Sequence, residues 1–390
     1  MYFANKMTIA DDHSLCNNAA GGGDNGEPEE VGFEFPLFEN DGFDKGEVDH
    51  KYDQMEHYRN RPLASMLENV IWSNVIILGT IHLVGLYGMC RLTSIYLQTC
   101  IFLHVLNCLC GMGLQAGAHR YYSHRSYKAN TGVQIFLMLC HTMSLQNSLY
   151  QWVRDHRIHH KFSETDADPH NIKRGIFFAH CGWLLMNKHP DVVARGRQID
   201  VSDLRSDPIV MFQRRYYAPL FLVFWGLIPA MIPVYGWGES WSNSILVCVF
   251  FRYVLVLNIT WLSNSCAHHW GVRPYDIRLG ATECAVRHLL MGDGFHNYHH
   301  AFPWDYSTSE FGINKVFNPV TATIDLFAWS GWAWDLKKVS ASLVERKKAQ
   351  EGVDLLDYSS YSGVYEWVSG VASVMAPITV VQCILLLLVK

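Results

Sequence analysis

The sequence lacks the cysteine patterns of a disulfide framework or a thiolate metal site. It has eleven cysteines in 390 residues, but none of them forms a C-x-x-C motif, and the nearest pair is Cys108 and Cys110. Several cysteines lie within apolar runs, as Cys100 and Cys248 do. A free thiol in such a run packs as a small hydrophobic side chain. We therefore expect free thiols and no disulfide.

Other motifs are missing too. The segment Met1–Ser14 has no apolar core, so we expect no cleaved signal peptide. The apolar stretches contain no Asp/Glu-x-x-His pair, which argues against the soluble, carboxylate-rich diiron bundles. An H-P-G-G element, typical of a fused haem domain, is absent, because the only His-Pro, at His189, is followed by Asp191. The net charge of −5 gives no indication of a nucleic-acid partner, and we expect none.

Histidine, in contrast, is concentrated in three short clusters. They read H-R-Y-Y-S-H from His119, H-R-I-H-H from His156 and H-N-Y-H-H from His296, and together they hold eight of the twenty histidines. In an H-x-x-H-H cluster the three histidines lie on one face of a helix. Adjacent members diverge by about 100° at ~3.6 residues per turn, so one helix can supply ligands to two metal ions. Neutral imidazole suits several transition metals.

The first cluster has a different spacing. His119 and His124 are five residues apart, which puts them on different faces of a regular helix. We therefore expect a helix to end within this cluster. Two H-x-x-H-H clusters together with an H-x(4)-H on one chain favour a metal site over a set of unrelated histidines.

Hydropathy predicts a membrane protein. Four apolar stretches each have close to the ~20 residues that a helix needs to cross the hydrocarbon core. These stretches cover residues about 69–90, 94–115, 218–236 and 244–262. His82 and His104 fall inside the first two stretches, and we expect them to be hydrogen-bonded residues of the helix bundle.

The histidine clusters can share one site only if they lie on the same side of the membrane. Residues 132–150 are moderately apolar and connect the first two clusters, so we expect them not to cross. Four crossings return the chain to the side it left. Residues 116–215 carry fourteen Lys and Arg, whereas the two short links between paired spans carry Arg91 at most. The positive-inside rule therefore places the clusters and the N-terminus in the cytosol.

These features predict an all-α integral membrane protein. Residues 63–345 would form one domain, in which four transmembrane helices carry a cytosolic helical cap that holds a histidine-ligated dimetal site. Residues 1–62 are polar and acidic, and we expect them to form a disordered tail. Residues 346–390 form a second tail. Its apolar segment 371–389, interrupted by Pro377, is either a fifth span or a helix lying in the interface, and the sequence slightly favours the interface or a tilted insertion.

Longer strings surround the histidines. They are G-A-H ending at His119, D-H-R around His156, N-S-C-A-H from Asn264 and G-F-H-N-Y-H-H-A-F-P-W-D-Y from Gly294. In these strings the sequence resembles the membrane acyl-CoA desaturases, in particular the stearoyl-CoA and insect enzymes, over residues about 60–345. The resemblance implies an O2-dependent enzyme that removes two hydrogens from adjacent methylenes of a saturated acyl chain and leaves a cis double bond and water.

By motif position, the resemblance also implies two iron ions near the cytosolic membrane surface, held almost wholly by histidine. The ligands of one ion would be His119, His124, His156, His160 and His299. The ligands of the other would be His159, His268, His296 and His300, with Asn264 acting through a water. The adjacent residues His159 and His160 would thus serve different ions, in agreement with the divergence of neighbouring helical positions.

The resemblance further implies partners and a location. The protein would be a multi-pass protein of the endoplasmic reticulum membrane, with its N-terminus and metal site in the cytosol. Since no fused haem element is present, cytochrome b5 and its NADH-dependent reductase would supply two electrons. The double bond would follow carbon nine, the common outcome among these enzymes, although insect relatives vary its position and the chain length.

Substrate contacts are implied by motif position as well. The residues implied to contact CoA are Asn74, Asn147, Arg154, Asp155 and Lys188. The residues implied to line the bend of the acyl tunnel are Trp152, Thr260 and Trp261. The chain departs from its relatives at Asn187, at Tyr121-Tyr122 and around Gly111. Because Gly111 is small, we expect a tunnel that is deeper or ends differently.

Three alternatives are open. A histidine-box fatty acid or alkane hydroxylase would use the same metal site and leave a hydroxyl group. A non-catalytic metal-binding or lipid-binding membrane protein would be favoured by a missing ligand, but all nine expected histidines and Asn264 are present. A haem-based membrane oxidoreductase would use His82, His104 and His141, and it would leave the three clusters unexplained. We therefore favour the desaturase.

Overall fold

Helices make up nearly all of the regular structure of this protein. The computed structural model describes residues 68–352 and 363–388, which belong to one compact unit. The only sheet in these ranges pairs β1 (Lys128–Ala129) with β2 (Ala333–Trp334) in antiparallel orientation. The prediction of a helical fold is confirmed. The predicted disordered tail, residues 1–62, lies outside the described residues.

Within the described residues, five helices are long and apolar enough to cross a membrane. Their residues are Trp72–Cys90, Leu97–Ser123, Tyr217–Trp237, Trp241–His268 and Gly363–Leu388. The first four overlap the four apolar stretches predicted from the sequence, and the fifth contains the apolar segment near the C-terminus. Length and composition therefore indicate a membrane protein, with one candidate span more than the four expected.

Three of these helices change their winding along their length. α2 (Trp72–Cys90) is regular, but α3 (Leu97–Met112) continues into the wider π-helix η2 (Gly113–Ser123). The third helix consists of α10 (Tyr217–Phe221), η5 (Leu222–Leu227) and α11 (Ile228–Trp237). The fourth consists of α12 (Trp241–Asn243), η6 (Ser244–Phe251), α13 (Arg252–Asn264) and η7 (Cys266–His268).

The links between paired helices meet at one end of the bundle. In the first link, Arg91 Nε donates to Asn243 Oδ1 at 3.0 Å. In the second link, Glu239 Oε2 accepts from Thr99 Oγ1 at 2.6 Å and from the Tyr96 amide at 3.0 Å. These polar contacts join the two hairpins at the end that lies away from the histidine clusters, which we call the linked end.

Small residues bring the first and fourth helices close together. A Cβ atom at Gly88 would lie 2.2 Å from the Leu246 carbonyl oxygen, and a Cβ atom at Gly85 would lie 2.6 Å from Val254 Cγ2. Only glycine leaves room for so close an approach of two backbones. The bundle thus holds its hairpins together by packing along its length and by hydrogen bonds at the linked end.

The helix after the first cluster is too short to cross the membrane. α4 (Thr131–Ser144) has 14 residues and is about 21 Å long at ~1.5 Å per residue, against ~30 Å of hydrocarbon. It packs against η2 and α3. This agrees with the expectation that residues 132–150 do not cross.

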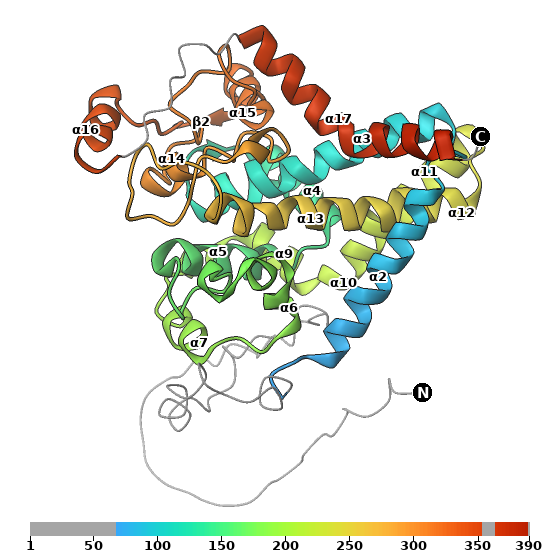
Figure 1. The fold of residues 1–390 in the computed structure, drawn as a ribbon, viewed down its shortest axis with the longest axis horizontal. Helices are drawn as coiled ribbons and strands as arrows, with labels where there is room; N and C mark the ends of the chain where they lie inside the picture. The colour runs from blue at the N-terminus through green and yellow to red at the C-terminus, as the bar shows by residue number, and fades with distance from the viewer. Residues whose placement is uncertain (1–67, 353–362, 389–390) are drawn as a thin grey trace, which may run out of the picture. The chain divides into compact units, whose positions relative to one another are not determined.

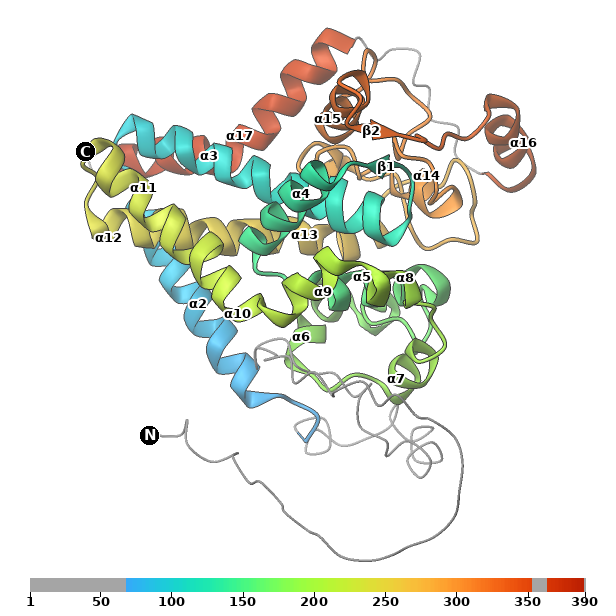
Figure 2. The same ribbon diagram turned by 180° about the vertical axis from the view of Figure 1, so that it is seen from behind.

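Further short helices surround the histidines. Before the third long helix these are α5 (Leu149–Phe162), η3 (Ile172–Arg174), η4 (Phe178–Gly182), α6 (Trp183–Leu185), α7 (Pro190–Gly196), α8 (Ser202–Ser206) and α9 (Pro208–Arg215). After the fourth they are η8 (Ala285–His288), α14 (His296–Ala301), α15 (Pro319–Trp329) and α16 (Ala341–Glu351). Figures 1 and 2 show α5–α9 on one side of α13 and α14–α16 on the other. We call this end of the bundle the histidine end.

α17 (Gly363–Leu388) begins at the histidine end, and its second half lies beside α3 towards the linked end (Figures 1 and 2). Near its start, Glu366 Oε1 lies 2.8 Å from Arg287 NH2. Near its end, Gln382 Nε2 donates to Leu92 O, in the first link, at 2.8 Å. Its 26 residues extend about 39 Å at ~1.5 Å per residue. This length is sufficient for a membrane span, and whether α17 crosses, is inserted at a tilt or lies in the interface stays a prediction.

Candidate metal centre

Nine histidines converge in two groups at the histidine end, and the ring nitrogens within each group lie within 4.8 Å of one another. The first group comprises His119, His124, His156, His160 and His299. The second group comprises His159, His268, His296 and His300. The grouping is the one implied by the family resemblance, and the neighbours His159 and His160 face different groups. That these residues bind metal ions stays a prediction.

The first cluster comes together because its helix is wider than an α-helix. In a π-helix, hydrogen bonds join residues five apart, and here the His124 amide donates to His119 O at 3.1 Å. The two rings therefore lie on the same face of the helix, edge to face at 82°, with centroids 4.9 Å apart. The helix ends at Ser123, so the predicted helix end is confirmed. The wide turn, however, is what aligns the two rings.

α5 supplies three histidines from one regular helix. It begins with a capping box formed by Ser148 and Gln151. Farther along, Arg157 NH2 lies 2.7 Å from Asp203 Oδ2 on α8 and donates to Tyr122 O at 2.7 Å. These contacts hold α5 against the end of η2, so that the first and second clusters face each other.

The third cluster lies on the short helix α14. Its two non-histidine residues, Asn297 and Tyr298, bond to other parts of the chain. Asn297 Nδ2 donates to Asp276 O at 2.9 Å, and the Tyr298 hydroxyl donates to Asp305 Oδ2 at 2.8 Å. Both side chains are buried. A helix too short to be stable alone is thus held in place with its histidines facing the other clusters.

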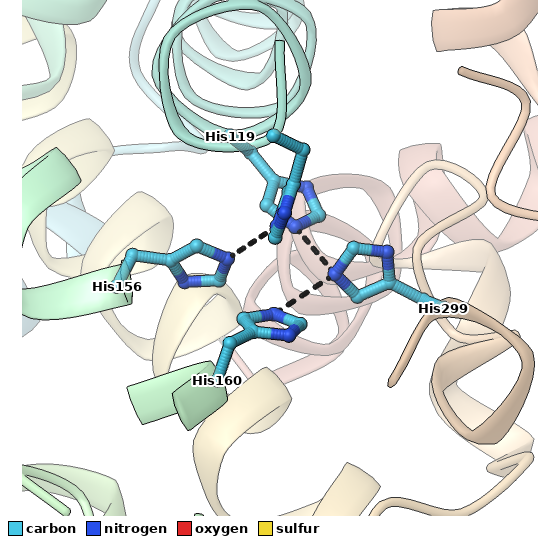
Figure 3. Close-up of side chains that lie close together, drawn as sticks. His119, His156, His160 and His299 are labelled. Atoms are coloured by element: carbon cyan, nitrogen blue, oxygen red, sulfur yellow. Dashed lines mark hydrogen bonds between the residues drawn. The ribbon is translucent and has the colours of Figure 1, made fainter. Parts of the chain in front are cut away.

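The ring nitrogens face one another at short distances. Nε2 of His299 lies 2.9 Å from Nε2 of His119 and 3.0 Å from Nε2 of His160 (Figure 3), and His124 and His156 approach to 2.9 Å in the same way. Two nitrogens that bind one ion at ~2.1 Å and at right angles lie about 3.0 Å apart. A ring nitrogen carries either one proton or one lone pair, so hydrogen bonds alone do not satisfy His299 Nε2 toward both neighbours. The spacing fits a shared ion.

Burial keeps six of the nine histidines in the neutral form that binds metals. All six have a pKa well below that of free histidine, because burial disfavours the charged ring and neighbouring rings repel added charge. These six are His124, His156, His160, His296, His299 and His300. Neither group contains a carboxylate or a thiolate. The all-imidazole donor set suits iron, zinc, copper or nickel, so the residues fit two transition-metal ions without selecting iron.

One histidine of each group contacts a carboxylate through its Nδ1 atom. Asp293 Oδ2 lies 2.7 Å from His119 Nδ1, and Asp168 Oδ1 lies 2.8 Å from His159 Nδ1. A partner on Nδ1 leaves Nε2 to face the ion and fixes the orientation of the ring. The other Asp293 oxygen lies 2.6 Å from NH2 of Arg120, which is fully buried.

Both carboxylates stay ionised although they are buried. Burial alone would raise the pKa of Asp293, but Arg120 and His119 outweigh it and hold this pKa well below its usual range. Burial also opposes the ionisation of Asp168, but His159 outweighs it, and the pKa falls to about 2. Each imidazole therefore has an anionic partner at neutral pH.

Neither Asp168 nor Asp293 is among the site residues predicted from the sequence. A weak signal was available, because Asp293 lies three residues before His296 and Asp168 lies eight residues after His160. An acidic residue in a polar segment is usually solvated. Only the fold distinguishes these two from the other acidic residues near the clusters.

A cavity of about 870 Å³ adjoins both groups. Four histidines, two from each group, form part of its wall, and they are His119, His156, His159 and His296. Six further residues of the predicted site also line it: Asn147, Trp152, Asp155, Thr260, Trp261 and Asn264. The predicted tunnel residues are therefore placed beside the histidines.

A second cavity, of about 610 Å³, continues from the first. The two cavities have Leu114, Gln115 and Thr260 in common. Gly111 lines the second cavity, and a Cβ atom on it would lie 2.5 Å from Met291 Sδ. The space around Gly111 thus extends the first cavity away from the histidines.

Three residues predicted to contact CoA form an ionic group beside the first cavity. Asp155 Oδ2 lies 2.8 Å from Lys188 Nζ, and Asp155 Oδ1 lies 3.1 Å from Arg154 NH2. Burial alone would raise the pKa of Asp155, but Lys188 and Arg154 outweigh it and lower this pKa to about 2. Asn74 is placed differently: its Nδ2 donates to Leu184 O at 2.7 Å, and it lines neither cavity.

Among the histidines outside the two groups, His189 lies with Asp166 and Asp191 in a small, partly exposed group that could hold a cation, in the described part of the chain. His82 is hydrogen-bonded within the bundle, as expected, with Nδ1 2.8 Å from Leu78 O and Nε2 3.2 Å from Asn258 Nδ2. His104 and His141 are buried and belong to neither group. The haem-based alternative therefore gains no support from their placement.

The family follows from comparison with known proteins. The fatty acid desaturase family model matches residues 97–309, more than half of the chain. The chain belongs to the fatty acid desaturase family. It is 48% identical to an acyl-CoA Delta-9 desaturase of Acheta domesticus over 318 residues, which cover 81% of this chain and 88% of that protein.

Other relatives of this desaturase come from vertebrates and moths. It is 45% identical to stearoyl-CoA desaturase 5 of Bos taurus, with 75% of this chain and 88% of the relative covered. It is 46% identical to an acyl-CoA Delta(11) desaturase of Spodoptera littoralis, with 73% and 84% covered. The predictions of the membrane acyl-CoA desaturase family and of an enzyme are confirmed.

Proposed function

We propose that this desaturase introduces a cis double bond into a saturated fatty acyl-CoA, with O2 as the oxidant. The observation that carries the proposal is that each of the two all-histidine groups contributes two histidines to the wall of the first cavity. Relatives that are named for acyl-CoA or stearoyl-CoA support the substrate class.

In this proposal the nine histidines of the two groups hold two iron ions, with Asn264 at the second ion through a water. The ions, when bound, supply the oxidising chemistry that removes the two hydrogens. Asp293 and Asp168 orient the rings of His119 and His159, so that Nε2 of each faces its ion. The other residues of the site bind the acyl chain, bend it and exclude water.

The bend of the acyl chain would lie where the two cavities adjoin. Trp152 and Trp261 line the first cavity beside the histidines, and Gln146 Nε2 donates to Thr260 Oγ1 at 3.0 Å at the junction. A chain that follows this bend holds one carbon–carbon bond in a cis-like shape next to both groups. Such positioning accounts for a cis product, because the reacting methylenes are held in one geometry.

The CoA moiety would lie beside the first cavity, near Lys188 and Arg154. Asp155 holds both cations in place, and cations recognise the phosphates of CoA. Asn147, which lines the first cavity, has a buried Oδ1 without a hydrogen-bond partner among the described residues, and the Oδ1 of Asn74, farther from the cavity, has none there either. These oxygens are available to accept hydrogen bonds from the amide or adenine groups of CoA.

The protein would lie in the endoplasmic reticulum membrane with its histidine end and N-terminus in the cytosol. The fourteen Lys and Arg of residues 116–215, against Arg91 in the links, support this orientation. Cytochrome b5 and its NADH-dependent reductase would supply the electrons. An exposed cation on α5, Lys161, lies next to His160 and would attract an acidic partner to this face.

The double bond would follow carbon nine. The Acheta relative is named a Delta-9 enzyme, but the Spodoptera relative, at nearly the same identity, is named a Delta(11) enzyme. Identity alone therefore does not decide the position, and the product has to be measured.

The test is the fatty-acid profile of a desaturase-deficient yeast that expresses this chain. Double-bond position is read by mass spectrometry after derivatisation, and the matched control is His160→Ala at equal expression. New cis monounsaturated acids that the control lacks are expected. Hydroxy acids would show the alternative, a histidine-box hydroxylase, and the absence of any new product with working cytochrome b5 would contradict the proposal.

A further inference from the structure

One residue in the lining of the second cavity belongs to a helix outside the family match. The lining comes from α3, η2, α13, residues 289–291 and a single residue of α17, Val374. The family model ends at residue 309, so α17 lies outside the residues that this model matches. The cavity is lined mostly by apolar side chains, as a site for a hydrocarbon chain requires.

α17 is anchored at the histidine end by a buried carboxylate. Glu366 is 2% exposed, and its oxygens lie 2.8 Å from Arg287 NH2 and 3.1 Å from His288 Nε2. Arg287 and His288 directly precede residues 289–291, which line the second cavity. Breaking a buried ionic contact is strongly unfavourable, so the start of α17 and this part of the lining are held together.

α17 is also anchored along its length. A Cβ atom at Gly370 would lie 2.0 Å from Phe317 Cγ, so this part of the helix touches the aromatic ring directly. Ile378 is fully buried in an apolar cluster that includes Leu103 and Phe251. Val374 lies between these two contacts. It is therefore held against the cavity and not at a free end of the helix.

We propose that α17 is a fifth membrane-spanning helix that closes the lipid-facing side of the second cavity. In this arrangement Val374 limits the length of acyl chain beyond the double bond. Gly111 lines the same cavity from α3, so the two residues bound one space from two helices. This inference rests on the proposed desaturation of fatty acyl-CoA.

The test compares Val374→Trp with Val371→Trp in the desaturase-deficient yeast. Val371 is on the same helix but is 52% exposed, so it is a matched control for a bulky residue on α17. Val374→Trp is expected to shift the ratio of sixteen-carbon to eighteen-carbon monounsaturated products by on the order of tenfold, because a pocket discriminates roughly tenfold or more per methylene. Val371→Trp is expected to leave the ratio unchanged.

A second variant covers the case in which Val374→Trp does not fold. Val374→Ala enlarges the space without overpacking, and it is expected to shift products towards longer chains. Unchanged ratios in the Val374 variants, with an active wild type, would overturn the inference while the proposed function stands. An inactive wild type would instead contradict the proposed function.

Whether α17 crosses the membrane is tested in a separate experiment. A glycosylation acceptor appended to the C-terminus is expected to be modified, because α17 would carry it into the lumen. A matched acceptor inserted into the first link, beside Arg91, should be modified as well. Modification of the link acceptor alone would show that α17 does not cross.

Discussion

The two histidine groups differ in how the negative charge of their hydrogen-bonded carboxylate is compensated. In the first group, Asp293 faces the buried guanidinium of Arg120 at 2.6 Å. In the second group, Asp168 accepts hydrogen bonds from the backbone amides of Glu164 and His170, each at 2.9 Å. A buried cation thus balances one anion, whereas backbone dipoles and an imidazole balance the other.

This difference separates two tasks of a buried carboxylate. Both carboxylates orient an imidazole, but only Asp293 also neutralises a cation that is completely enclosed. Removing a partner from a buried charge costs far more than removing a neutral hydrogen bond. The two groups should therefore respond alike in metal binding and differently in folding stability.

The largest effects are expected from removing one ligand of each group. His160→Ala should lose an ion from the first group and His300→Ala an ion from the second, and each should reduce desaturation by more than about 100-fold, beyond the loss typical of outer-shell changes. Metal content per purified protein and product yield are the measurements. His269→Ala, at an exposed histidine in neither group, is the control. Loss of both ions from either variant would contradict the prediction, because the two groups would then not bind their ions independently.

The carboxylates should give the next largest effects. Asp293→Asn and Asp168→Asn are each expected to weaken metal binding by roughly 10–100-fold. Asp293→Asn should also lower the free energy of unfolding by about 3–5 kcal/mol, because Arg120 then stays buried without its anion. Metal titration and thermal unfolding of both variants give the comparison. Equal unfolding temperatures would show that charge balance does not distinguish the groups.

A change in the second cavity should leave both groups intact. In Gly111→Leu the new side chain would displace Met291, whose Sδ lies 2.5 Å from the Cβ position, and would fill part of the second cavity. It should therefore shorten the preferred acyl chain, with a shift in product ratio of roughly tenfold. Metal content should equal that of the wild type. Product profiles and metal analysis check this, and an unchanged profile would mean that the chain does not reach Gly111.

The smallest effect, a change in folding stability with pH, is expected at a third buried acid, Glu283. Its Oε1 accepts a hydrogen bond from the Tyr298 amide of α14 at 2.9 Å. Burial raises the pKa of Glu283 to about 8. The folded protein then holds a proton that the unfolded chain releases above about pH 4.5. Stability from this group is therefore present at low pH and is lost as the pH rises from about 4.5 to 8.

Glu283→Gln removes this titration. The variant should unfold at a temperature a few degrees higher than the wild type at pH 7.5, and the difference should vanish near pH 4.5. Thermal unfolding at the two pH values is the measurement. A constant difference across this range would show that Glu283 does not hold the proton, and that it resembles Asp168 and Asp293 instead.

Local patterns accounted for much of the fold and the site. Apolar runs of about 20 residues marked the long helices, and the i, i+3, i+4 spacing explained why His159 and His160 face different groups. The same local logic was insufficient at His119 and His124, since a regular helix separates residues five apart. A π-turn restores their alignment, and no local pattern in this segment predicts that turn.

By itself the sequence determined the histidine clusters, the apolar helices and the family, because each depends on residues that are near one another along the chain. Only the tertiary structure decided which histidines meet, as His119 and His299 do across 180 residues. It also decided which acids stand behind them and where α17 packs. The physical reason is that these contacts depend on how helices far apart in sequence pack and on which buried charges are paired. The spacing of neighbouring residues determines neither.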